Sequence, residues 1–486
     1  MALILNLVLT GNKKINGLNI DLGNNMRIMQ KLFHKKVSFE ESPESHSGLK
    51  RTLSTLDLIF LGIGAIIGAG IFVMTGIVAS THAGPGVILS YIIAGLATGF
   101  CALSYAELAS SVGGCGSAYG YSYVAFGEFI AWIIGWDLIL EYGFAGVAVA
   151  IGWGSYLNDI LVAMGIHLPW ILCKIPSEGG WINILPMIIL LIITAVLALG
   201  ASVSARVNNV IVFIKLFSIV LFIVLAAQNV HIENWSNFLP FGWTGVMEGA
   251  ALIFFAYLGF DAVSTATEEA INPQRSIPIA IMTSLLVCTA LYVAVSGLAT
   301  LIVPYTSLNV ASPLSQALLH LGYRFGSALI SAGAIAGLTT VILVVFYGLT
   351  RILFAMSRDG LLPAKFSEVA SSTGAPVKII IICGSLMAFV SGTVSMHLVA
   401  ELINLGTLAA FCIVSIGVIV LRYRAPNMHR PFRSPLGITF PILGILACLY
   451  LMIYIPSVTW LRLVIWFIIG VIIYFSYGFR RVHRKN

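Results

Sequence analysis

Long apolar runs recur through almost the whole chain and limit its fold more than any other feature of the sequence. Twelve runs are long enough, at about 20 residues each, to cross a hydrocarbon core roughly 30 Å thick as helices. We place them near residues 55–80, 84–111, 122–157, 181–200, 206–228, 244–268, 278–303, 326–356, 378–393, 398–422, 438–457 and 460–479. Only 9% of the 486 residues are charged, against about a quarter in soluble domains. The sequence therefore predicts an all-α integral membrane protein with 12 transmembrane helices.

The runs leave no segment long enough for a separate soluble domain, so we expect one membrane domain at 55–479. Residues 1–54 and 480–486 are expected to form cytoplasmic tails. The third and eighth runs exceed the thickness of the bilayer, and we expect them to tilt or to protrude into water.

Basic residues indicate the orientation of the chain. The N-terminal tail, the loops after the eighth and tenth runs and the C-terminal tail carry most of the 26 Lys and Arg residues. Lys174, Arg324 and Arg462 lie on the opposite side. Because basic loops stay in the cytoplasm, we expect a multi-pass protein of the cell (inner) membrane with both termini cytoplasmic. The charges flank the runs and form no basic patch with interleaved aromatic residues, so nucleic acid is not an expected partner.

Glycines interrupt the first run at mid-membrane depth, within Gly62–Phe72. Small residues spaced like Gly64 and Gly68 also allow close packing of neighbouring helices, which is an alternative explanation. The density of glycines among β-branched isoleucines favours local unwinding instead. In hydrocarbon, an unwound segment persists only where its freed backbone groups face a cavity or a ligand. Free N–H groups at the start of the outer half-helix would suit a carboxylate.

A second interruption lies in the sixth run, at Phe254–Asp261. Carbonyl groups left unpaired around Phe255, Ala256 and Leu258 can accept hydrogen bonds from an ammonium group. Two interrupted spans, one in each half of a many-span protein, are typical of a transporter's substrate site. Donors for a carboxylate on one break and acceptors for an ammonium on the other predict a site for an α-amino acid.

Several motifs follow one another along the chain. They are Gly62–Phe72, Phe255–Ser264 followed by Glu268-Glu269, Gly135–Tyr142, Asn272–Arg275, Ser357–Pro363 and Arg430–Arg433. In this order they resemble the amino acid, polyamine and organocation (APC) transporter superfamily, and more narrowly the bacterial members of the cationic amino acid transporter family. The resemblance implies a five-plus-five inverted repeat with discontinuous helices one and six. The first repeat would span about 55–228, the second about 244–422, and two additional helices about 438–479.

The resemblance also implies roles for residues at the two breaks. Family members bind the substrate's carboxylate at the positions of Gly68, Ala69 and Gly70. They bind its amino group at the positions of Phe255, Ala256 and Leu258, and Ile66 would line the pocket. Ala69 departs from the pattern because a hydroxyl residue often stands there, which leaves the backbone amides to bind the carboxylate.

On the eighth run, Val345 and its neighbours are expected to give the pocket a mainly apolar wall, which favours a small or apolar neutral amino acid.

Lys215 lies in the middle of the fifth run. One alternative is that it snorkels to the interface. Burial disfavours the charged form of a lysine, which makes Lys215 a candidate proton carrier. It also matches a family lysine that occupies the place of a sodium ion in sodium-coupled relatives. The sequence therefore predicts proton coupling, or at least independence from sodium.

Buried carboxylates need a reason in a membrane protein. Glu141 in the third run is either a hydrogen-bonded core carboxylate or a gating or proton-relay residue. Asp261 is expected to cap or orient the inner half-helix of the sixth run. We expect Glu107, Glu268 and Glu269 to pair with cytoplasmic Arg or Lys residues, as parts of an inside gate.

Other function classes lack support in the sequence. The seven cysteines show no CxxC spacing and the nine histidines form no ligand pair, so we expect no metal and no cofactor. Catalytic motifs such as HExxH and GxSxG are missing, which argues against an enzyme and against catalytic residues. We predict a secondary active transporter with an amino acid substrate, a proton as coupling ion and the lipid bilayer around it. A cationic amino acid transporter, an exchanger and a nutrient sensor with a transporter fold remain alternatives.

Overall fold

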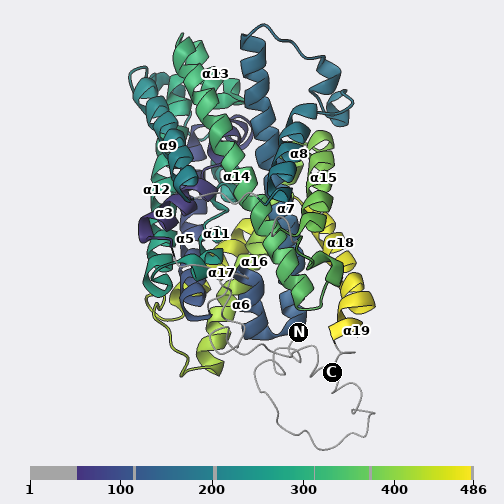
Figure 1. The fold of residues 1–486 in the computed structure, drawn as a ribbon. Coiled ribbons are helices and arrows are strands. Elements are labelled where there is room, and N and C mark those ends of the chain that lie inside the picture. Colours follow the sequence, from purple (N-terminus) through teal and green to yellow (C-terminus); the bar gives the residue numbers. More distant parts are fainter. Residues whose placement is uncertain (1–51, 113–116, 201–204, 311, 371–374, 483–486) are drawn as a thin grey trace, which may run out of the picture.

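The computed structural model describes residues 52–112, 117–200, 205–310, 312–370 and 375–482. These residues form helices, and the one β contact among them is an isolated bridge between Leu53 and Ala270. Figure 1 shows the long helices side by side, roughly along the long axis of the molecule. The all-helical prediction is confirmed for this part of the chain.

The α-helices of the described residues are α3 (Thr55–Ile66), α4 (Thr75–Val78), α5 (Val87–Val112), α6 (Ser117–Phe126), α7 (Glu128–Ala163), α8 (Ile184–Ala198), α9 (Ala205–Ala227), α10 (Gly242–Ile253), α11 (Ala262–Thr265), α12 (Pro273–Ile302), α13 (Pro313–His320), α14 (Arg324–Arg358), α15 (Val377–Thr393), α16 (Met396–Arg424), α17 (Thr439–Ile453), α18 (Ser457–Ile473) and α19 (Phe479–Val482). Short 3₁₀ and π-helical pieces connect them: η2 (Gly70–Met74), η3 (Ala79–Ala83), η4 (Gly84–Gly86), η5 (Trp170–Leu172), η6 (Pro176–Glu178), η7 (Ile232–Trp235), η8 (Phe254–Tyr257), η9 (Thr267–Glu269), η10 (Tyr305–Leu308), η11 (Ala364–Phe366) and η12 (Tyr474–Gly478).

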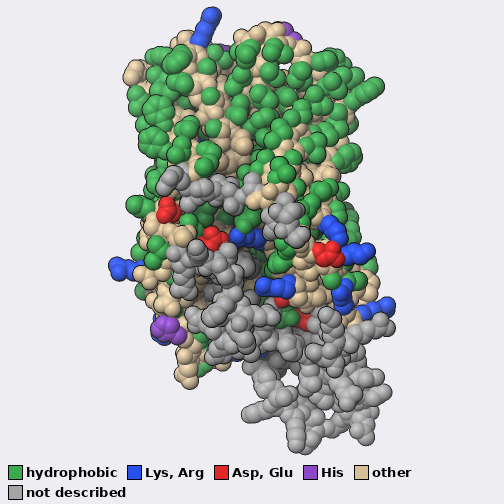
Figure 2. Space-filling model, in the orientation of Figure 1, with side chains coloured by type: hydrophobic (Ala, Val, Ile, Leu, Met, Phe, Trp, Pro, Cys, Tyr) green, Lys and Arg blue, Asp and Glu red, His purple; other side chains and the backbone are tan. Residues whose placement is uncertain are grey.

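Eight helical segments among the described residues are long and apolar enough to cross a membrane, and three shorter apolar helices accompany them. One of the eight, Thr55–Val112, covers the first two predicted runs, and each of the others coincides with a single run. Large apolar side chains such as Phe213 and Phe217 on α9 are 66% and 57% exposed. Figure 2 shows one face of the molecule, with hydrophobic side chains over its upper part and most of the Lys and Arg side chains of that view in its lower part. This is the surface of a multi-pass membrane protein.

The third predicted run differs from the structure at its beginning. The run at 122–157 is divided, because α6 ends at Phe126 and α7 begins at Glu128. Gly127 between them has a φ of 100°, a conformation that side chains with a Cβ rarely adopt. The 36 residues of α7 rise about 54 Å at 1.5 Å per residue, so this helix is longer than the hydrocarbon core.

Helix α7 packs against α14, α16 and α8, while α3 packs against α12, α9 and α14. The segment after α3 contacts η8, which follows α10. These contacts bring the interrupted parts of the first and sixth runs together beside α7 and α14.

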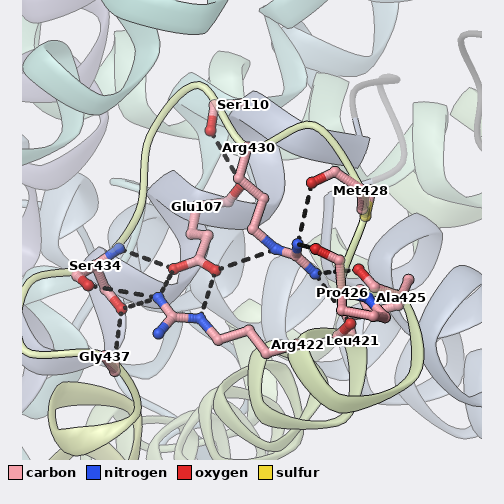
Figure 3. Close-up of polar contacts among 10 residues, drawn as sticks. All are labelled: Glu107, Ser110, Leu421, Arg422, Ala425, Pro426, Met428, Arg430, Ser434 and Gly437. Carbon is pink, nitrogen blue, oxygen red and sulfur yellow. Dashed lines mark hydrogen bonds and ion pairs between the residues drawn. The ribbon is translucent and has the colours of Figure 1, made fainter.

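A buried ion-pair cluster joins α5 to the last turn of α16 and to the segment between α16 and α17 (Figure 3). The Glu107 carboxylate lies 2.5 Å from a guanidinium nitrogen of Arg422 and 3.7 Å from Arg430 Nε, and it accepts a hydrogen bond of 2.8 Å from the Ser434 amide. Glu269 pairs with Arg351 at 3.4 Å. The expected pairing of Glu107 and Glu269 with arginines is therefore confirmed, whereas the side chain of Glu268 lies outside the described part of the structure.

Candidate substrate site

Helix α3 ends in the middle of the first run. Ile67 has a ψ of 96°, which is not helical, and its amide is the last to donate back into α3, to the Ile63 carbonyl. Helical turns resume at Gly70, in the π-helical η2. The end of α3 therefore leaves carbonyl groups without helical partners, and the start of the next segment leaves N–H groups in the same condition.

The sixth run is interrupted at the corresponding place. Helix α10 tightens into η8, Leu258 has a ψ of 148°, and Gly259 has a φ of 103° before α11 begins. A Cβ on Gly259 would lie 2.8 Å from the backbone carbon and oxygen of Ala65. A Cβ on Gly70 would lie 2.5 Å from the Ala256 Cα. Glycine at these two positions allows the two breaks to touch each other.

A pocket lies between the two breaks, α7 and α14. It contains about 470 Å³ of space that no protein atom occupies, part of which is open to solvent. Its lining residues are Ala65, Ile66, Gly68, Ala69, Gly70, Glu141, Tyr142, Ala145, Val149, Phe255, Leu258, Gly259, Asp261, Ala262, Val341 and Val345.

Most of the candidate residues from the sequence are in this lining. Those that line the pocket are Ile66, Gly68, Ala69, Gly70, Glu141, Phe255, Leu258, Asp261 and Val345. Ala256 and Lys215 are not among the lining residues. Lys215 lies behind the first break, where it donates to backbone carbonyls. Ala256 belongs to the second break, and its carbonyl accepts a hydrogen bond from Tyr292.

The wall formed by α7 and α14 is apolar on one side and acidic on the other. Glu141, Ala145 and Val149 follow one another at intervals of four residues, so they share one face of α7. Val341 and Val345 show the same interval on α14. The two valines on α14, together with Ala145 and Val149, form the apolar side, and Glu141 stands at its edge.

Asp261 occupies the N-cap position of α11, but its side chain makes no capping bond there. The carboxylate instead accepts a hydrogen bond of 2.6 Å from the Tyr142 hydroxyl on α7. Of the two roles expected of Asp261, to cap or to orient the inner half-helix, the capping role is therefore wrong. The reason is that a buried phenol within reach offers the carboxylate a partner from another helix, and sequence reasoning did not identify Tyr142.

Three carboxylate oxygens on α7 lack hydrogen-bond partners in the described structure. Oε2 of Glu141 and both side-chain oxygens of Asp137 are buried without one. Asp137 lies against α16, where a Cβ on Gly406 would be 2.7 Å from Asp137 Oδ1. Unpartnered carboxyl groups are costly to bury and mark functional positions in membrane proteins. Sequence reasoning did not single out Asp137, although its spacing of four from Glu141 on one helix was a signal.

Lys215 is fully buried, with 0% of its surface exposed. Its Nζ donates hydrogen bonds of 2.8 Å to the Gly64 carbonyl and 2.7 Å to the Ile67 carbonyl. These carbonyls belong to the end of α3, where the helix dipole is negative, so an ammonium group is well placed there. The alternative of snorkelling to the interface is wrong, because the side chain is directed into the protein.

Tyr292 on α12 holds the two breaks together. Its hydroxyl lies 2.9 Å from the Ile66 carbonyl and 2.8 Å from the Ala256 carbonyl. Tyr91 on α5 donates in the same way to the Gly70 carbonyl, at 2.9 Å. Neither tyrosine was identified from the sequence, because no local pattern indicates which distant hydroxyl reaches a freed carbonyl.

The family of the chain follows from comparisons with known proteins. The family model for amino acid permeases matches residues 53–475. The methylthioribose transporter of Bacillus subtilis is 47% identical over 93% of this chain and 98% of its own length. The branched-chain amino acid permease BcaP of Bacillus subtilis is 45% identical over the same shares. Human cationic amino acid transporter 4 is 38% identical over 82% of this chain and 64% of its own length. The chain belongs to the amino acid permease family of the APC superfamily.

Proposed function

We propose that this protein is a secondary active transporter that takes up neutral or small apolar amino acids, coupled to protons, by alternating access. The observation that carries the proposal is the pocket between the two helix breaks, with backbone groups of both breaks in its lining. Amides after the first break would bind the carboxylate at Gly68, Ala69 and Gly70, and carbonyls of the second break would bind the ammonium group at Phe255 and Leu258.

The proposed architecture has 12 spans in a five-plus-five inverted repeat. The repeats would cover about 55–228 and about 244–422, followed by two additional helices at about 438–479. Both tails, 1–54 and 480–486, would lie in the cytoplasm, in accordance with the basic residues near the ends of the spans.

A branched aliphatic side chain suits the apolar side of the pocket. Ala145 and Val149 on α7 and Val341 and Val345 on α14 offer only methyl and methine groups, and burial of a Leu or Val side chain there is favourable. Two similar proteins are named branched-chain amino acid permeases, from Bacillus subtilis and from Lactococcus lactis, the latter at 33% identity.

The acidic edge of the pocket supports a second candidate substrate. Glu141 and Asp261 both line the pocket, and carboxylates attract a cationic side chain or accept bonds from hydroxyl groups. Similar proteins include cationic amino acid transporters and a methylthioribose transporter. Arginine and methylthioribose are therefore tested as substrates beside the aliphatic amino acids. Amino acid exchange and nutrient sensing are the alternative functions to test.

Lys215, Glu141 and Asp261 are the proposed coupling and gating residues. Lys215 would take the part of a bound cation by holding the Gly64 and Ile67 carbonyls. Loss of its proton would weaken both bonds and free the end of α3 to move. Asp261 would link the second break to α7 through Tyr142.

Competition in proteoliposomes tests the substrate class. Unlabelled leucine, isoleucine and valine should compete with labelled leucine for uptake, and arginine and methylthioribose should compete weakly. The reverse order would reject the aliphatic assignment in favour of the acidic edge. A protein that binds leucine but accumulates none under an imposed gradient would be a sensor.

The Lys215→Ala variant tests the coupling residue. We expect it to lose accumulation driven by a pH gradient, because no cation then holds the end of α3. Lys378→Ala is a matched control, since Lys378 is exposed and pairs with Glu368 at the surface. Unchanged gradient-driven accumulation in Lys215→Ala would reject this role for the lysine.

A further inference from the structure

Two histidines join the turn after the first span to the first turn of α16. His82 lies in η3, and its ring stacks on that of His397 with centroids 6.1 Å apart and planes inclined by 18°. His82 Nδ1 is 2.7 Å from the Thr81 hydroxyl. His397 Nδ1 is 3.4 Å from Glu401 Oε1, one turn further along α16. This histidine pair, His82 and His397, is separate from the substrate pocket.

The charges around the histidine pair come from four elements. On α16 and α18, Glu401 accepts a 2.6 Å bond from Thr459 and lies 3.6 Å from Arg462. Glu248 on α10 attracts a positive charge on His82 and so favours its protonated form. The neighbouring η10 carries one titratable side chain, Tyr305. His397 therefore acts on the charge of His82 in one direction, and the carboxylates Glu248 and Glu401 act in the other.

The structure favours the neutral form of His82. Burial and the facing His397 lower the pKa of His82, and this outweighs the opposite effects of Glu248 and Glu401. His82 lies between the predicted spans 55–80 and 84–111, at an end of the molecule that water can reach. Because the pKa of His82 is lowered, neutral His82 stabilises its contact with His397 at pH values above the usual pKa of histidine. This stabilisation is lost as the pH falls through the lowered pKa of His82.

The position of His82 connects the histidine pair to the pocket. From Gly70 in the pocket lining, η2, α4 and η3 follow one another to Ala83 without an intervening loop. We propose that the stacked His82 and His397 form a proton-sensitive outer gate, which holds the outer half-helix of the first span closed when His82 is neutral and releases it when His82 is protonated. The proposal rests on the proposed function only for the assignment of this end as external.

Access of a reagent to the pocket tests the gate without any transport. Val149→Cys places a thiol in the pocket lining, in a background where Cys173 is replaced by Ser. A membrane-impermeant methanethiosulfonate reagent is added outside intact cells at about pH 7.5 and about pH 5.5. The labelling rate is divided by that of an exposed reporter, Met164→Cys, which is 70% exposed. This division removes the effect of pH on thiol reactivity.

We expect the normalised rate to rise at the lower pH, by up to roughly a hundredfold, the order of effect of two like charges about 6 Å apart near a protein surface. His82→Gln and His397→Gln should abolish this rise, and His82→Arg should label quickly at both pH values. His167→Gln, which changes an exposed histidine after α7, should keep the rise. Size-exclusion profiles check that each variant is folded.

An equal rise in His82→Gln, or slow labelling of His82→Arg at both pH values, would overturn the gate. If the pH response holds but no substrate is transported, the proposed function fails and the gate stands.

Discussion

Tyr292 is the single residue on which the distance between the two breaks depends most directly. Its hydroxyl is within hydrogen-bond distance of a carbonyl on each break. Tyr292→Phe keeps the ring and removes the hydroxyl, which leaves buried carbonyls without a donor at a cost of about 1–2 kcal/mol. We expect roughly tenfold weaker apparent affinity for substrate in uptake assays. Tyr450→Phe is the control, because Tyr450 is exposed and its hydroxyl bonds to the neighbouring Tyr454 hydroxyl at the surface.

If Tyr292→Phe had the same apparent affinity for substrate as the parent protein and the Tyr450→Phe control, Tyr292 would not hold the site in the state that binds substrate.

Gly259 tests the close approach of the two breaks. Its φ of 103° and its contact with Ala65 both exclude a Cβ. Gly259→Ala should reduce initial uptake roughly tenfold or more, since backbone strain alone costs about 1–2 kcal/mol. Gly165→Ala separates the two causes, because Gly165 also has a positive φ, of 81°, but nothing lies within 4 Å of its Cβ position. Comparable losses in both variants would show that strain and not the contact is responsible.

At the scale of elements, the Glu107 cluster fixes α5 to the last turn of α16 and to the segment between α16 and α17 (Figure 3). Glu107→Gln leaves Arg422 and Arg430 without their anion, and removal of one partner from a buried ion pair costs about 3 kcal/mol or more. We expect a fall of several degrees in melting temperature in detergent. Glu368→Gln should change it little, because Glu368 and Lys378 are both 57% exposed. Equal shifts in the two variants would contradict a structural role for the cluster.

The elements also show what the sequence can and cannot predict. Glycine density and a long apolar context were enough to place both breaks, because unwinding depends on local backbone freedom. The division of the third run at Gly127 was not predictable, since a single glycine inside an apolar run is compatible with a continuous helix. The bonds of Asp261 to Tyr142 and of Ala256 to Tyr292 were not predictable, because each joins helices more than thirty residues apart in the chain.

On the scale of the whole molecule, one arrangement explains the positions of the functional candidates. The two breaks meet across the pocket, Lys215 holds the end of α3 from behind, and α7 and α14 form the opposite wall. An integral membrane protein of the amino acid permease family needs such a site near the middle of the bilayer. The central claim is that substrate bound between the breaks crosses the membrane with a proton.

Uptake of labelled leucine into proteoliposomes tests this claim most directly, with a pH gradient, acidic outside, imposed in sodium-free medium. We expect accumulation above the equilibrium level, which collapses when a protonophore removes the gradient. An absolute requirement for sodium, or equilibration without accumulation in the presence of the gradient, would contradict the account.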